Sequence, residues 1–156
     1  MRNAPTWRAP AWYAKPAPRL LFQHRLAACD LRVRVVRPPR RHRGGFAIAV
    51  RLDLPDLPVQ AVTVVFGRAA PNIPHVYTDL PSDSPHRYPD GSLCMWYPGD
   101  PAEQRWTRKD GPVALLGHVV AHLLRERWWQ RTGEWPGEEA AHLPTGETGE
   151  TGTEAA

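Results

Sequence analysis

The sequence predicts an α+β fold in which an antiparallel β-meander is followed by a long loop and a packing helix. Three segments with the alternation or β-branched composition of strands follow one another over short, turn-rich links. Such links favour antiparallel pairing of consecutive strands. One long amphipathic segment comes later and can cover a face of the sheet. A chain of 156 residues fits one domain with its own core.

The chain ends differ in composition from this central part. Residues 1–18 are rich in proline and alanine, so they predict an irregular arm whose aromatic residues Trp7, Trp12 and Tyr13 dock on the body. Residues 144–156 are a low-complexity acidic tail without the apolar residues of a core, and we expect them to be disordered. The domain itself is therefore expected to span residues 19–143.

The first half of the domain carries the strand signals. Residues 19–28 fit either a short helix or a first strand, and their periodicity does not separate the two. Residues 30–37 alternate Leu31, Val33 and Val35 with arginines, as in a half-buried strand. Residues 45–55 alternate in the same way, and residues 59–67 form a β-branched run that ends at a glycine.

Residues 113–133 predict the long helix. Apolar residues recur at three- and four-residue spacings, and Gly133 is a plausible stop. The apolar positions are Val113, Leu116, Val120, Leu123 and Leu124. Trp128, Trp129 and Trp135 are interpreted as packing groups.

Two histidines and a glutamate lie on one face of this helix. His118, His122 and Glu126 follow at intervals of four residues, and the His-x3-His spacing is compatible with zinc. A further ligand is not evident nearby, and the inner glutamate of the zinc-protease motif is missing. We therefore interpret the three as ordinary polar positions and predict no metal site.

The two cysteines have different surroundings. Cys94 lies in a long proline-punctuated region, residues 70–112, and long loops inside compact domains are usually functional. Its polar Pro/Asp/Gly surroundings, in "SPHRYPDGSLCMWY" (84–97), favour an accessible thiol over a buried one. Cys29 follows an apolar run at a predicted strand edge and is interpreted as a packing residue. Two cysteines do not indicate a disulfide framework.

Charge is unevenly distributed along the chain. Residues 1–51 contain 12 Arg or Lys and one acidic residue, whereas residues 52–156 contain 8 basic and 15 acidic residues. A basic third of the chain could contact nucleic acid. Aromatic side chains do not interleave with the arginines of residues 37–45, so a nucleic-acid-binding domain is the weaker alternative. The absence of a long apolar run predicts a cytoplasmic protein that neither spans nor binds a membrane.

The segment around Cys94 resembles the active-site pattern of ubiquitin-conjugating enzymes, H-P-N-(x)4-G-x-[I/L]-C-L. Four residues match at the same spacing: Pro85, Gly91, Leu93 and Cys94. His86 stands in place of the asparagine and Ser84 in place of the histidine. Together with a W-x-x-T-G-x-W-x-G-x-E ending within residues 126–142, this combination is similar to the bacterial E2-like proteins of anti-phage (CBASS-type) or ThiF-linked operons.

The resemblance implies a ubiquitin-conjugating-enzyme-like fold and a role in antiviral defence. It also implies that residues 71–79 form a further strand and that Trp106 precedes the long helix. In this interpretation Cys94 carries a protein C-terminus as a thioester and passes it to an amine. His86 would stabilise the oxyanion, and the turn at Asp90 and Gly91 would shape the approach. An alternative role for Asp90 is to orient or deprotonate the incoming amine.

The resemblance also implies the partners. The expected partners are a ubiquitin-activating-like (ThiF-fold) enzyme and, as acyl donor, a ubiquitin-like protein or a cGAS-like nucleotidyltransferase. Because the activating enzyme consumes the ATP, the carrier itself needs no cofactor. The main alternative is a catalytically silent relative that serves as a binding module.

Overall fold

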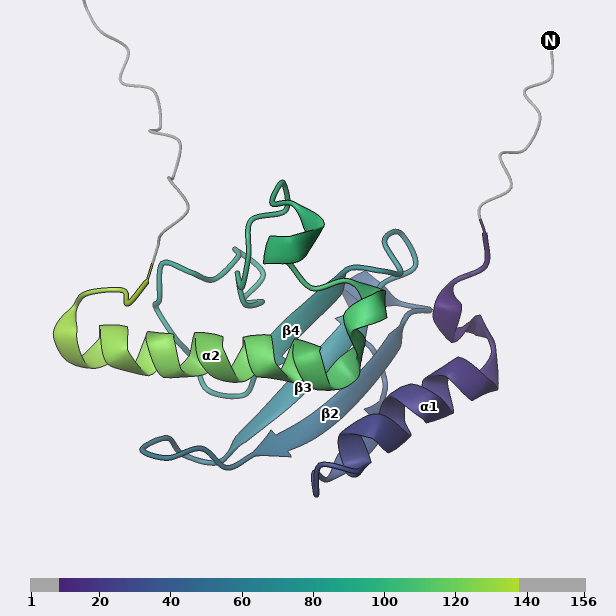
Figure 1. The fold of residues 1–156 in the computed structure, drawn as a ribbon, viewed down its shortest axis with the longest axis horizontal. Coiled ribbons are helices and arrows are strands. Elements are labelled where there is room, and N and C mark those ends of the chain that lie inside the picture. Colours follow the sequence, from purple (N-terminus) through teal and green to yellow (C-terminus); the bar gives the residue numbers. More distant parts are fainter. Residues whose placement is uncertain (1–8, 138–156) are drawn as a thin grey trace, which may run out of the picture.

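A four-stranded antiparallel sheet organises residues 9–137, the part of the chain that the computed structural model describes (Figure 1). The strands occur in the order β1-β2-β3-β4 and have the bounds Val33–Val36, Phe46–Leu52, Gln60–Phe66 and Pro74–Thr78. The helices are α1 (Pro16–Ala27) and α2 (Gly111–Thr132), with 3-10 turns η1 to η4 at Trp12–Ala14, Arg40–His42, Ala102–Gln104 and Arg108–Asp110. The predicted α+β class and the meander are confirmed.

The strand register places one apolar face of the sheet in the core. Val64 of β3 pairs with Ile48 of β2 and Val76 of β4, and all three are buried. The further strand implied for residues 71–79 is therefore present as β4. Val35 of β1 departs from the expectation, since 51% of its surface is exposed. β1 is an edge strand with a neighbour on one side only, so its burial is incomplete.

The N-terminal segment is helical earlier than predicted. α1 begins at Pro16, inside the segment 1–18 that was expected to be irregular, because proline suits the first turn of a helix. Residues 19–28 therefore belong almost entirely to a helix. The docking of Trp12 is confirmed: its ring centroid lies 5.1 Å from that of Phe66, and its indole N–H donates to the Pro71 carbonyl at 2.8 Å.

The predictions for Tyr13, Trp7 and the acidic tail remain to be compared with the structure. Tyr13 is buried against Phe46, as expected of a docked aromatic residue. Trp7 and the acidic tail 144–156 lie outside the described residues.

α2 confirms the predicted helix and lies across one face of the sheet (Figure 1). It ends where Gly133 adopts a φ of 77°, the left-handed conformation that glycine tolerates without strain. The predicted buried face was wrong in part, since Val113 and Leu124 are exposed. The residues buried most deeply in the core from this helix are Leu115, Val119 and Leu123.

The tryptophans also divide into two groups. Trp106 is buried in the core and donates its indole N–H to the Gly111 carbonyl at 2.7 Å, just where α2 begins. Trp128 is 54% exposed, so its predicted packing role is wrong. It lies on the side of α2 that does not face the sheet core. Among the described residues, we find no helix whose length and apolarity would let it cross a membrane.

Candidate functional site

Between β4 and α2 the chain forms a tight hairpin that ends at Cys94. The Gly91 N–H donates to the Tyr88 carbonyl at 2.8 Å, and Gly91 has a φ of 85°. The Tyr88 N–H donates to the Ser92 carbonyl at 2.9 Å, which closes the turn. At the base, the Cys94 N–H donates to the His86 carbonyl at 3.0 Å. The two residues predicted to be catalytic therefore lie opposite each other across the hairpin.

The hairpin is attached to the sheet next to its edge strand. The Leu93 N–H donates to the carbonyl of Val76 in β4 at 2.9 Å, and the Leu93 side chain is buried in the core. Because Cys94 is the next residue, its backbone position is fixed by the sheet. The region 70–112 is thus more ordered than its sequence suggests, since it contains β4, this hairpin and two 3-10 turns.

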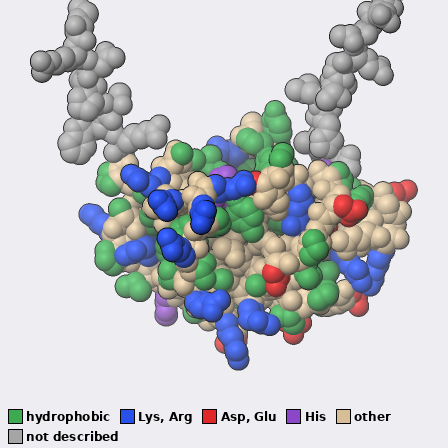
Figure 2. Space-filling view, turned by 180° about the vertical axis from the view of Figure 1, so that it is seen from behind, with side chains coloured by type: hydrophobic (Ala, Val, Ile, Leu, Met, Phe, Trp, Pro, Cys, Tyr) green, Lys and Arg blue, Asp and Glu red, His purple; other side chains and the backbone are tan. Residues whose placement is uncertain are grey.

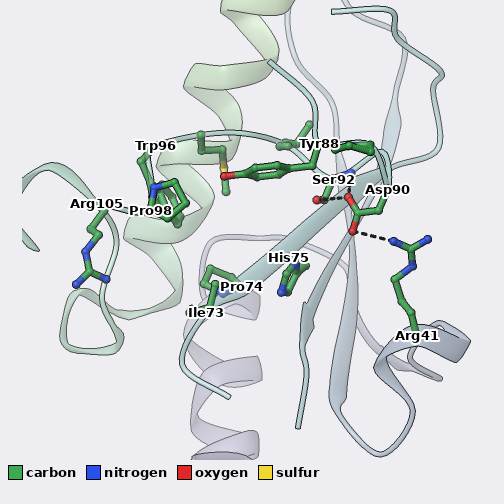
Figure 3. Close-up of a pocket in the computed structure, with 13 residues that line it drawn as sticks. Arg41, Ile73, Pro74, His75, Tyr88, Asp90, Ser92, Trp96, Pro98 and Arg105 are labelled. Carbon is green, nitrogen blue, oxygen red and sulfur yellow. Dashed lines mark hydrogen bonds and ion pairs between the residues drawn. The ribbon is translucent and has the colours of Figure 1, made fainter. Parts of the chain in front are cut away.

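Asp90 holds the tip of the hairpin with both carboxylate oxygens (Figure 3). One oxygen accepts from the Ser92 N–H at 3.0 Å and from the Ser92 hydroxyl at 2.6 Å. The other accepts from the Tyr77 hydroxyl at 2.9 Å and pairs with the Arg41 guanidinium at 3.1 Å. Burial opposes ionisation, but these hydrogen bonds and Arg41 lower the pKa of Asp90 to about 2. So weak a base is unsuited to deprotonating an amine.

The Cys94 thiol is half-buried and lies among aromatic residues. Its sulfur is 3.9 Å from the Trp96 carbonyl oxygen. Tyr88 lies close to it: burial first, and the interaction with Cys94 second, raise the pKa of Tyr88 well above its usual value. Tyr88 thus places a hydroxyl donor beside the sulfur, a feature that the sequence analysis missed.

Cys29 differs from its prediction as a packing residue. It is exposed in the turn after α1, where its sulfur lies 3.7 Å from the Arg25 carbonyl oxygen. The helix occupies the segment expected to be a possible strand, so Cys29 falls beyond the helix end instead of at a strand edge. It provides an exposed thiol for comparison with Cys94.

The His86 imidazole is buried against the segment that follows α2. Its ring centroid lies 4.0 Å from that of Trp135, and the His122 ring centroid lies 5.3 Å from the same tryptophan. Trp135 therefore has the packing role predicted for it. The contact fixes the orientation of His86 next to the hairpin base.

A buried ion pair joins the hairpin to α2. Arg87 donates from two nitrogens to the two carboxylate oxygens of Glu126, at 2.7 and 3.1 Å. Only 10% of the Arg87 side-chain surface and 6% of that of Glu126 are exposed. His122 Nε2 lies 3.6 Å from one of these oxygens, and His122 is 2% exposed. The interpretation of His122 and Glu126 as ordinary polar positions was wrong.

The physical reason is that His122 and Glu126 continue the buried face of α2 that Leu115, Val119 and Leu123 form. Glu126 and His122 lie one turn apart on the face that meets the hairpin, so they are enclosed together with Arg87. The four-residue spacing of these two groups was visible in the sequence. Their partner was not, because Arg87 lies 39 residues away and resembled any other surface arginine.

Acid should weaken this ion pair. Burial opposes ionisation, yet the nearby His122 ring and the hydrogen bonds and charge of Arg87 lower the pKa of Glu126 from 4.5 to about 2. A lowered folded-state pKa contributes stability above about pH 4.5 that is lost as the pH falls towards about 2. As the pH is lowered from about 5 to about 3, we expect the urea concentration at the unfolding midpoint to decrease. The decrease should be smaller in Glu126→Gln. Equal pH dependence in both proteins would contradict this assignment.

An apolar groove lies beside the hairpin and has a volume of about 590 Å³ (Figure 3). Its walls include Ile73, Pro74, Tyr88, Trp96 and Pro98, and Arg41 and Arg105 lie on opposite sides of the view. Leu93 and Met95, the neighbours of Cys94, also line it. The groove can therefore hold an extended segment of chain alongside the cysteine.

Three potential metal ligands lie close together behind the hairpin. The ligand atoms of His42, His75 and Asp90 are within 4.8 Å of one another. Two of these groups already have partners, because His42 Nε2 lies 3.0 Å from the Tyr77 hydroxyl and Asp90 pairs with Arg41. We interpret the group as a hydrogen-bonded network that supports the hairpin tip, and we assign no metal to it.

Comparison with known proteins identifies the family. The family model for the Type II CBASS E2 protein matches residues 21–143, most of the chain, including the hairpin, α2 and the whole sheet. The same comparisons found no match among curated proteins and none among solved structures. The four-stranded antiparallel sheet with its C-terminal helix is compatible with an E2-like fold. The chain belongs to the Type II CBASS E2 family, the bacterial E2-like proteins of CBASS anti-phage operons.

Proposed function

We propose that Cys94 carries a protein C-terminus as a thioester and transfers it to an amine. The observation that carries the proposal is the position of the half-buried thiol at the base of a hairpin fixed to both the sheet and α2. An acyl carrier needs a thiol that a partner can reach and a backbone that holds it in place. Family membership supports a conjugating transferase acting in anti-phage defence.

The reaction consists of two acyl transfers. In the first, the Cys94 thiolate attacks the carbonyl carbon of a thioester on an activating enzyme, a new S–C bond forms, and the thiolate of that enzyme leaves. In the second, an amine attacks the carbonyl carbon on Cys94, an N–C bond forms, and the Cys94 thiolate leaves while the amine nitrogen loses a proton. The carrier supplies the thiol and the surroundings of both tetrahedral intermediates.

In this proposal, two side chains would stabilise the oxyanion of those intermediates. His86 lies across the hairpin from Cys94, and its ring is held by Trp135. The Tyr88 hydroxyl lies beside the sulfur and can also donate. A preorganised donor of this kind is worth roughly 3–4 kcal/mol in other enzymes. In this assignment His86 and Tyr88 share the role, and Asp90 and Gly91 shape the turn between them.

The partners follow from the same proposal. A ThiF-fold activating enzyme would load Cys94, and the donor would be a ubiquitin-like protein or a cGAS-like nucleotidyltransferase with a flexible C-terminus. The groove of about 590 Å³ suits the last residues of such a terminus, because its lining is mostly apolar and includes Leu93 and Met95, the neighbours of Cys94. These reactions would take place in the cytoplasm.

Replacing the sulfur with oxygen tests the proposal. Cys94→Ser, loaded by the activating enzyme with a donor protein from the same operon, should form an ester that resists dithiothreitol, whereas the wild-type adduct is cleaved. Cys29→Ser removes the exposed thiol and should leave both loading and cleavage unchanged. Gel electrophoresis with and without dithiothreitol checks both. Loading that does not depend on Cys94 would contradict the proposal, and failure of both wild type and Cys94→Ser to load would favour the silent binding module instead.

A further inference from the structure

Two adjoining hollows lie at the end of the sheet where β1 connects to β2, away from the Cys94 groove. The first, of about 400 Å³, is lined by Arg37, Pro38, Pro39, Arg40, Arg43 and Gly44. The second, of about 680 Å³, includes Tyr13, Arg19, Gly44, Gly45 and Arg68 in its lining. Gly44 belongs to both hollows, so they form one continuous surface. None of their lining residues lines the groove beside Cys94.

The surface is strongly basic, and none of the described residues that line it is acidic. Within residues 9–137, its arginines form no ion pair with a carboxylate. These arginines are Arg19, Arg37, Arg40, Arg43 and Arg68. Figure 2 shows basic side chains gathered on one part of the face seen from behind. Five uncompensated guanidinium groups around concave surfaces create a positive potential that attracts anions.

A buried hydroxyl provides an independent sign of a ligand. Tyr13 lines the larger hollow and is 8% exposed, and its hydroxyl has no hydrogen-bond partner within residues 9–137. Burial raises the pKa of Tyr13, while the positive charge of Arg68 acts in the opposite direction. Most buried hydroxyls in proteins are hydrogen-bonded, so this covered donor would be available to an acceptor in the hollow once a covering side chain moves aside.

Arg68 covers this part of the hollow with a side chain that can move. Its stem passes so close to Gly44 that a Cβ at that position would lie 2.6 Å from the Arg68 Cδ. Arg68 is exposed, and its guanidinium has no fixed partner among the described residues. Reorientation of this side chain would bring its guanidinium and the Tyr13 hydroxyl to the same anion.

We propose that the two hollows bind the phosphate groups of a nucleotide-type ligand. The guanidinium fork matches phosphate oxygens in a bidentate manner, and five of them around two hollows suit a ligand with more than one phosphate. Hollows of about 400 and 680 Å³ have the size of small-ligand sites. Sequence reasoning found no aromatic residue among these arginines. In the structure, Tyr13, which lies outside residues 37–45 in the sequence, also lines the larger hollow.

The test uses the full chain and a fluorescein-labelled single-stranded DNA of about 10 nucleotides, followed by fluorescence anisotropy. Binding should weaken steeply between about 50 and 200 mM salt, as expected for phosphate contacts. The variant with Arg37, Arg40 and Arg43 each changed to Gln should lose at least about tenfold in affinity. The matched control changes Arg32, Arg34 and Arg51, exposed arginines outside the hollows, each to Gln. Its affinity for the probe should fall by less than about threefold.

Tyr13→Phe separates a specific site from a general charge effect. The change removes one oxygen and no charge, so a general attraction between arginines and polyanions would leave affinity unchanged. If the hydroxyl binds phosphate, affinity should fall by about threefold or more. Circular dichroism and the urea midpoint of the variant show whether its fold is intact.

Competition experiments identify the source of the phosphate. Displacement of the probe by ATP would indicate a free nucleotide, whereas displacement only by unlabelled oligonucleotide would indicate a strand, and either result supports the proposal. Equal displacement by polyglutamate at matched charge would overturn it, because the surface would then respond to charge alone. Equal losses in the two triple variants, or no salt-sensitive binding by the wild type, would also overturn it.

Discussion

Glu126→Gln is expected to lower the free energy of unfolding by about 3–5 kcal/mol, because it leaves the buried Arg87 charge without its counter-charge. The carboxylate accepts from two Arg87 nitrogens and lies 3.6 Å from His122 Nε2. Glutamine keeps the size of the side chain but offers one acceptor oxygen and no charge. Urea unfolding at pH 7, followed by tryptophan fluorescence, measures the loss.

A double variant distinguishes a broken ion pair from a general packing defect. Arg87→Met combined with Glu126→Leu removes both charges and keeps apolar volume, and it should cost less than Glu126→Gln alone. The hairpin would still lose its charged link to α2. A loss below about 1 kcal/mol for Glu126→Gln would mean that the pair is effectively solvated, contrary to its burial in the structure.

Changing His86 is expected to have the largest effect on transfer rate. His86→Ala should slow discharge of the loaded Cys94 to free amine by about 10²–10³-fold, the usual effect of removing one oxyanion donor. Single-turnover discharge, started from purified loaded protein, measures this step without contributions from the activating enzyme. The loading rate alone does not isolate the transfer step, because both acyl transfers pass through a tetrahedral intermediate.

Two further variants assign the donor. His86→Asn introduces the amide that ubiquitin-conjugating enzymes have at this position, and it should recover much of the rate if donation is the role. Tyr88→Phe removes the hydroxyl beside the sulfur and should produce a smaller loss, because His86 remains. A full rate in His86→Ala with a strong loss in Tyr88→Phe would transfer the role of oxyanion donor to Tyr88.

Local patterns predicted the sheet and the long helix well. The alternation of apolar residues and the short links are local features, and they located β1 to β3 and α2 within a few residues. The arm was less predictable: α1 has proline at its start and two exposed leucines, Leu20 and Leu21, so its pattern did not separate helix from strand. Contacts with the aromatic core, including Phe22, determine the outcome there.

The candidate site was only partly visible in the sequence because its contacts are long-range. The spacing around Cys94 and His86 is a local pattern, and the hairpin places the two residues opposite each other. The ion pair between Arg87 and Glu126 joins residues 39 positions apart, and no local pattern indicates such a partner. Similarly, the hydroxyl of Tyr88 reaches Cys94 only because the turn at Gly91 reverses the chain.

The most direct test of the central claim is intact-mass spectrometry of the loaded wild-type protein. After incubation with ATP, the activating enzyme and a donor protein from the same operon, the mass should rise by that of the donor minus one water. The increase should disappear on treatment with dithiothreitol, and peptide mapping should place the thioester on Cys94 and not on Cys29. An adduct on Cys29, or none on a protein whose Cys94 resists alkylation, would contradict the account.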